Sequence, residues 1–238
     1  MSSTQAKALV FDVFGTVVDW RGSVIRAGQA LGRAKGFEVD WARFADEWRE
    51  QGYHGGMNRV RSGELPWMNA DALHRLELDE LLPKYGIGGL TEAEIDHFNR
   101  VWHRLWPWPD SIPGLIRLKR KFTIAPLSNG SFALLTNMAK ETGLPWDCIL
   151  SAELVRKYKP DPATYQMAAD LLGLARDEVM LVAAHVNDLR AAQAAGLGTG
   201  YVPRPLERGP GGPPVAAPDA SFDVVATDFV DLAQKLGA

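Results

Sequence analysis

Residues 8–16 read Ala-Leu-Val-Phe-Asp-Val-Phe-Gly-Thr, and this stretch decides the fold. The apolar run from Ala8 to Phe11 predicts a buried β-strand, and Asp12 places a carboxylate directly after it. The Gly-Thr turn that follows offers backbone amides that steady a carboxylate or a developing negative charge. Alone, the stretch leaves two interpretations open, because an aspartate at a strand end also often caps the next helix.

Further short apolar runs of the same kind recur along the chain, at residues 122–127, 179–183, 199–202 and 224–226. Helix-length stretches separate most of them, and strands that alternate with helices are typical of a parallel sheet. We therefore predict an α/β fold with a doubly wound, Rossmann-like parallel sheet. In such a sheet, ligands bind beyond the carboxyl ends of the strands, where the winding reverses.

The long interval at residues 21–102 has no convincing strand, and its apolar residues recur at helical spacing, as in Phe44 and Trp48. The Trp-Pro-Trp-Pro sequence at 106–109 closes it, because proline interrupts a continuous helix. We predict a helical cap domain at 21–102, inserted after the first strand of a catalytic core formed by residues 1–20 and 103–238. The Pro/Gly-rich stretch from Pro203 to Pro218 is predicted to be a mobile loop remote from the chemistry.

The amino-acid composition indicates which kinds of partner and cell compartment to expect. The 238 residues carry a formal net charge of −3 and no run of Lys or Arg, so nucleic acid is not an expected partner. The single cysteine, Cys148, excludes an internal disulfide and favours a reducing compartment. The polar residues 1–7 lack the apolar stretch of a signal peptide or membrane span, so we expect a cytoplasmic protein with no membrane partner.

Three later segments carry polar residues to the same edge of the predicted sheet as Asp12. They are Leu-Ser-Asn-Gly at 127–130, Lys-Tyr-Lys-Pro-Asp at 157–161, and Val-Ala-Ala-His-Val-Asn-Asp-Leu at 182–189. Their order and spacing, with the helical insertion, resemble the haloacid dehalogenase superfamily over essentially the whole chain. The resemblance implies the α/β core and the cap described above.

Most members of that superfamily are magnesium-dependent phosphatases with two further acids in these motifs. One stands two residues after the nucleophile, where this chain has Phe14, and the other stands four residues before the final aspartate, where it has Ala184. A site that keeps only Asp12 and Asp188 as carboxylates would hold magnesium weakly and leave a phosphate charge poorly neutralised.

These departures resemble the type II L-2-haloacid dehalogenases, which use no metal. Phe14 occupies the place of their usual tyrosine, the pair Trp48-Arg49 is similar to their Trp-Arg pair, and Tyr165 matches their active-site tyrosine. The resemblance implies an (S)-2-haloacid dehalogenase that converts short 2-haloacids, such as haloacetate and L-2-halopropionate, to 2-hydroxyacids and halide through an aspartyl ester. It further implies no metal and no cofactor, and a possible homodimer.

The resemblance also assigns roles to the polar residues. Asp12 would be the nucleophile, and Lys159 would keep Asp12 and Asp188 ionised. Asp188 would activate the water that attacks the ester. Ser128, with nearby backbone amides, would hold the substrate carboxylate, and Thr16 would orient Asp12, although both hydroxyls also suit ordinary turn capping.

The leaving halide would depart toward the permanently charged Arg49 and the amide of Asn129. A solvent-exposed cap arginine is the alternative for Arg49. Phe14 and Trp48 are placed near the site, as part of an apolar lining to which Tyr53, Trp67 and Phe132 are further candidates.

His185 and Asn187 replace the asparagine and tryptophan found in characterised relatives. His185 either donates a hydrogen bond to halide or substrate, or relays a proton, or merely orients Asp188. Two other functions stay open: a magnesium-dependent phosphatase acting on a small phosphate ester, and a catalytically silent protein that binds a small acid.

Overall fold

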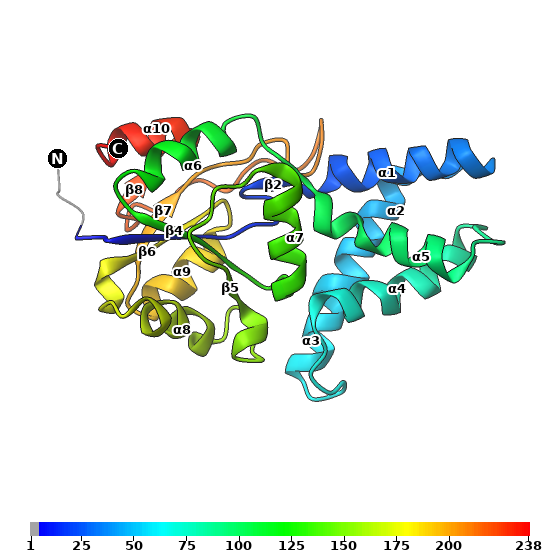
Figure 1. Ribbon diagram of the computed structural model, residues 1–238, viewed down its shortest axis with the longest axis horizontal. Coiled ribbons are helices and arrows are strands. Elements are labelled where there is room, and N and C mark those ends of the chain that lie inside the picture. The colour runs from blue at the N-terminus through cyan, green and yellow to red at the C-terminus, as the bar shows by residue number, and fades with distance from the viewer. Residues whose placement is uncertain (1–4) are drawn as a thin grey trace.

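The computed structural model describes residues 5–238, and its centre is a six-stranded parallel sheet (Figure 1). The strand order is β5-β4-β1-β6-β7-β8, so the chain winds outward in both directions from β1. The strands are β1 (Ala8–Phe11), β4 (Thr123–Ser128), β5 (Leu150–Ser151), β6 (Val179–Ala183), β7 (Gly198–Tyr201) and β8 (Val224–Val225). The predicted doubly wound α/β fold is confirmed.

Helices cover both faces of the sheet. The core helices are α6 (Ser111–Lys119), α7 (Phe132–Thr142), α8 (Pro162–Leu172), α9 (Val186–Ala194) and α10 (Phe229–Lys235). Figure 1 shows α6 and α10 on one side of the sheet and α8 and α9 on the other. Side chains of a strand alternate between faces, so Leu9 and Phe11 join the apolar cluster that includes α6 and α10, while Ala8 and Val10 join the cluster of α8 and α9.

Side-chain caps fix the first residues of α7 and α8. Ser131 accepts a hydrogen bond from the Leu134 amide and begins α7, only three residues after β4. Asp161 accepts from the Ala163 amide, and Pro162 occupies the first turn of α8. Both helices therefore begin at the carboxyl edge of the sheet, which is the edge where Asp12 follows β1.

Between β1 and the core helix α6, the chain forms helices and one short two-stranded ribbon. The helices are α1 (Trp20–Lys35), α2 (Trp41–Glu47), the π-helix η1 (Trp48–Gly55), α3 (Gly56–Arg61), α4 (Ala70–Lys84), α5 (Glu92–Asn99) and the 3₁₀-helix η2 (Arg100–Arg104). They lie to one side of the sheet in Figure 1. The cap limits at 21 and 102 stay a proposal.

The ribbon and β5 were not predicted from the sequence. Strands β2 (Val18–Asp19) and β3 (Trp106–Pro107) pair antiparallel where the chain leaves and re-enters the core, and two residues are too few to show a periodic pattern. Two short 3₁₀-helices, η3 (Ala152–Leu154) and η4 (Arg176–Glu178), complete the elements. Within residues 5–238, no helix is long and apolar enough to span a membrane.

Candidate active site

The carboxylate of Asp12 lies at the end of the central strand and is fixed from two sides. Its backbone amide donates to the Val182 carbonyl of β6 at 3.0 Å, which continues the sheet pairing. The Thr16 hydroxyl donates to Asp12 Oδ2 at 2.7 Å and accepts from the Ala184 amide at 3.0 Å. Thr16 therefore contacts the carboxylate and ties the first turn to the end of β6, which is the position that its predicted role calls for.

Lys159 joins the two carboxylates at this edge. Its buried ammonium lies 2.7 Å from Asp188 Oδ2 and 3.4 Å from Asp12 Oδ1, while its backbone amide donates to Asn129 Oδ1 at 2.8 Å. Burial opposes the charge on Lys159, but the two carboxylates outweigh it and raise its pKa. Lys159 therefore stays a cation, as its predicted role requires.

Asp12 remains ionised although its side chain is largely buried. Burial would raise the pKa of its carboxyl group, but the charge of Lys159 and the hydrogen bonds from His185 and Thr16 hold the pKa well below its usual value. A carboxylate that is ionised and poorly hydrated is suited to nucleophilic attack.

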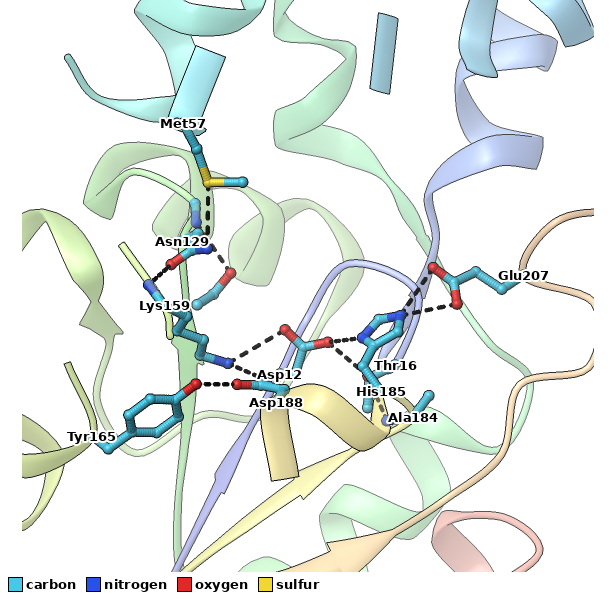
Figure 2. Close-up of polar contacts among 12 residues, drawn as sticks. Asp12, Thr16, Met57, Asn129, Lys159, Tyr165, Ala184, His185, Asp188 and Glu207 are labelled. Carbon is cyan, nitrogen blue, oxygen red and sulfur yellow. Dashed lines mark hydrogen bonds and ion pairs between the residues drawn. The ribbon is translucent and has the colours of Figure 1, made fainter. Parts of the chain in front are cut away.

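His185 bridges Asp12 and a residue that the sequence analysis missed. Its Nδ1 lies 3.0 Å from Asp12 Oδ2, and its Nε2 lies 3.0 and 3.2 Å from the two oxygens of Glu207. Figure 2 shows the Asp12 carboxylate between Lys159 and the His185 ring, with Glu207 on the far side of that ring. The side-chain contacts of His185 are with Asp12 and Glu207, while its backbone carbonyl accepts from the Asp188 amide at 3.1 Å, so the imidazole itself is directed at Asp12 rather than at Asp188.

Arg49 projects from the π-helix η1 into the same region. Its side chain is buried, its Nη1 has no hydrogen-bond partner among residues 5–238, and its guanidinium lies 4.2 Å from the ring centroid of Tyr53 and 5.1 Å from that of Phe14. A buried cation with a free donor and aromatic rings against its guanidinium is equipped to receive an anion. The alternative of a solvent-exposed cap arginine is excluded by this burial.

These groups surround a cavity of about 330 Å³. Its lining consists of Asp12, Phe14, Arg49, Tyr53, His54, Met57, Arg61, Asn129, Lys159, Pro160, Tyr165, His185, Asn187, Asp188, Glu207 and Arg208. Nine of the twelve residues predicted from the sequence to form the site lie in this lining. Thr16 lies directly behind Asp12, whereas Trp48 and Ser128 lie elsewhere.

Trp48 belongs to the core and does not line the cavity. It is fully buried, its indole NH donates to the His74 carbonyl at 2.8 Å, and its ring packs against Phe44 and Trp102. Successive residues of a helix point in different directions, so only Arg49 of the Trp-Arg pair faces the cavity.

Ser128 is also buried away from the cavity. Its hydroxyl accepts from the Gly130 amide at 3.1 Å, which is the turn-capping alternative left open by the sequence. Of the other aromatic candidates, Tyr53 lines the cavity, Trp67 packs on Tyr158, and Phe132 is exposed to solvent.

The prediction that residues 203–218 are remote from the chemistry is wrong, because Glu207 and Arg208 line the cavity. A signal was present in the sequence: Arg204, Glu207 and Arg208 place three charges within five residues of an otherwise Pro/Gly-rich stretch. Arg204 is buried and forms two hydrogen bonds with the Asp110 carboxylate. A charged, buried side chain in a loop indicates that the loop is packed.

Comparison with known proteins agrees with this geometry. The family model of the haloacid dehalogenase-like hydrolases matches residues 6–196, and the chain belongs to that family. The crystal structure of a defluorinating L-2-haloacid dehalogenase is 46% identical, with a TM-score of 0.94 over 98% of this chain and 96% of that one. A second L-2-haloacid dehalogenase structure is also 46% identical, with a TM-score of 0.93 over 98% and 99% of the two chains.

Among characterised proteins, (S)-2-haloacid dehalogenase 1 of Pseudomonas sp. (strain CBS-3) is 28% identical over 198 residues, which are 81% of this chain and 82% of that protein. Within the family, these similarities place the chain in the L-2-haloacid dehalogenase branch, as the motifs predicted.

Proposed function

We propose that this chain is an (S)-2-haloacid dehalogenase that hydrolyses short 2-haloacids to 2-hydroxyacids and halide. The observation that carries the proposal is the pairing of an ionised Asp12 with the buried, unpartnered Nη1 of Arg49 in one cavity. Similarity to proteins named (S)-2-haloacid dehalogenase supports it.

In the first step, an Asp12 oxygen attacks the carbon that bears the halogen. The new carbon–oxygen bond forms as the carbon–halogen bond breaks, and the halide leaves with the bonding electron pair. Arg49 receives the developing negative charge, and the aromatic rings around it exclude the water that would compete for its donors. Asn129, which lines the same cavity, is a further donor to the halide or to the substrate carboxylate.

In the second step, water attacks the carboxyl carbon of the aspartyl ester. Asp188 takes one proton from the water and returns it to the departing alkoxide, which leaves as the 2-hydroxyacid. The second water proton is lost to solvent when Asp12 ionises again. One oxygen of Asp12 therefore leaves with the product, and the water oxygen replaces it.

The cavity volume of about 330 Å³ favours acids of two or three carbons. Ser128 lies outside the cavity lining, so we assign it to the shape of the turn that presents Asn129 rather than to the substrate carboxylate. A homodimeric assembly and a cytoplasmic location remain separate proposals, which sedimentation analysis and cell fractionation would test.

The test is halide release from chloroacetate, fluoroacetate and both 2-chloropropionate enantiomers in excess EDTA, beside Asp12→Asn. We expect the wild type to release halide at a rate that EDTA does not change, and we expect Asp12→Asn to release none. A single turnover in oxygen-18 water should give unlabelled hydroxyacid, because the product oxygen comes from Asp12. Phosphate release from small phosphate esters that requires magnesium would instead favour the phosphatase, and binding of a small acid without turnover would favour a silent binder.

A further inference from the structure

Glu207 reaches the active site from the long loop between β7 and β8. Its carboxylate accepts from His185 Nε2 at 3.0 Å and from the Trp20 indole NH at 3.1 Å. It lies over the backbone of Gly15, where a Cβ atom would overlap the carboxylate. Gly15, with φ of +89°, therefore provides both the left-handed turn after Asp12 and the space that Glu207 occupies.

The loop is anchored on both sides of Glu207. On one side, the Arg204 guanidinium donates to the Thr16 carbonyl at 2.7 Å and pairs with Asp110. On the other, Arg208 pairs with Glu50 of η1 at 2.7 Å. The position of Glu207 is thus fixed to the core and to the helical insertion at once.

The two oxygens of Asp12 differ in their hydrogen bonding. Oδ2 accepts from the Thr16 hydroxyl at 2.7 Å and faces His185 Nδ1 at 3.0 Å. Oδ1 faces only the Lys159 ammonium, at 3.4 Å. The less engaged Oδ1 is the better nucleophile, which leaves Oδ2 as the carbonyl oxygen of the ester and, once water has added, as the oxyanion.

We propose that Glu207 is a positioning residue for ester hydrolysis: it holds the His185 ring so that Nδ1–H donates to Asp12 Oδ2 as that oxygen becomes the oxyanion. The inference rests on the proposed dehalogenase function. When water adds, an electron pair of the ester carbonyl moves onto Oδ2. When the intermediate collapses, the pair re-forms the carbonyl and the bond from the carboxyl carbon to Oδ1 breaks. His185 keeps its proton throughout, because Asp188 is the group that takes a proton from the water and returns it to the departing alkoxide.

The charges around His185 agree with this role. Burial opposes its charge, but the hydrogen bonds with Asp12 and Glu207 outweigh it and raise the pKa of His185 to about 10. The pKa of Glu207 is in turn held below its usual value, since the contacts with His185 and Trp20 outweigh burial. The titratable or charged groups that face His185 or its two carboxylates are Asp12, Arg49, His54, Lys159, Glu207 and Arg208.

The test compares Glu207→Gln with the wild type in single-turnover reactions over a range of pH. Glutamine keeps the acceptor for Trp20 but removes the charge that holds the imidazolium. We expect the alkaline limit of ester hydrolysis to move to lower pH by about one unit or more. At pH 9 the aspartyl ester should accumulate on Asp12, detected by mass spectrometry, and hydrolysis should slow by a larger factor at pH 9 than at pH 6. The ¹⁵N shifts of the His185 ring should report the same fall in its pKa.

Glu50→Gln is the matched control, because it removes the acidic partner of Arg208 in the same loop without touching His185. It should leave the pH profile unchanged, and Glu207→Asp should restore much of the alkaline limit. If Glu207→Gln lowers the rate of ester hydrolysis equally at all pH values, or if its pH profile is the same as that of Glu50→Gln, the inference is overturned while the proposed function stands. If the wild type releases no halide, the proposed function itself fails, whatever the ring nitrogen shifts show.

Discussion

Tyr165 and Asp188 form a hydrogen bond of 2.6 Å between the phenol hydroxyl and Oδ1, while Lys159 holds the other oxygen of the same carboxylate. Burial and the Asp188 charge raise the pKa of Tyr165, so the phenol keeps its proton and acts only as a donor. Asp188 is therefore fixed at both oxygens, and its orientation toward the ester depends on Tyr165.

Replacing Tyr165 by phenylalanine tests that dependence. The ring and its packing stay, but Asp188 loses one of its two restraints, so we expect hydrolysis of the ester to slow about tenfold. Ester formation should change little, because Asp12 does not contact Tyr165. Rapid-quench measurement of the two steps separates them, and an equal loss in both would contradict the assignment of Tyr165 to Asp188.

Arg49→Lys tests the halide contact. Lysine keeps the charge but loses the planar group that stacks on Tyr53 and Phe14, so the cation and its donors shift. We expect the rate constant for halide release to fall about 10²-fold. Arg59→Lys, an exposed arginine paired with Glu64, serves as the control and should leave the rate unchanged. A rate for Arg49→Lys close to that of the control would remove Arg49 from the mechanism.

Trp48→Phe should change stability and leave catalysis alone. The variant loses the indole hydrogen bond to His74 and leaves space in a buried aromatic cluster. We expect the free energy of unfolding to fall by about 1–3 kcal/mol in urea titrations. The KM for chloroacetate should stay within about twofold of wild type. A large rise in KM without a loss of stability would return Trp48 to the substrate pocket.

The pH dependence of stability should report His185. Its pKa is about 10 in the folded state and 6.5 in its ordinary range, so the folded state holds the proton more tightly. The resulting stabilisation is complete below about pH 6.5 and is lost as pH rises toward about 10. His185→Gln should flatten that decline in denaturant titrations.

His54→Gln is the control for this measurement. Burial and the Arg49 charge lower the pKa of His54 to about 4, so His54 is neutral above pH 6.5 and cannot contribute to an alkaline decline. The decline should persist in His54→Gln. If it persists equally in His185→Gln, another group is responsible.

The sequence predicted those parts of the molecule that follow from local patterns. The apolar run at 8–11 gave the correct central strand, and the strand-end positions of Asp12 and His185 placed them at one edge, because parallel strands share that edge. The resemblance of the segment at 157–161 assigns Lys159 a place beside Asp12 and Asp188, and its ammonium contacts both carboxylates.

The predictions that differ from the structure concern side-chain positions that depend on tertiary packing. Nothing in the order of Trp48 and Arg49 says which of the two faces the cavity, since that depends on how the helix is rotated against its neighbours. The Ser128 hydroxyl had two satisfactory partners in principle, and the nearby Gly130 amide is the one it contacts. The Pro/Gly content of the loop that carries Glu207 predicts mobility, but Arg204 and Arg208 anchor the loop, and the sequence pattern does not show those contacts.

The π-helix η1 makes the length of its segment as important as its composition. Residues Trp48–Gly55 wind more widely than an α-helix, and within that winding Arg49 and Tyr53 meet on one face, over the cavity. Residues three or four apart share one face of a helix, so loss of a single residue between Arg49 and Tyr53 would leave that pair together but would turn the helix that follows by about 100° relative to Arg49. A chain that keeps every side chain of this site but is one residue shorter in η1 would therefore turn Met57 and Arg61 away from the cavity that they line.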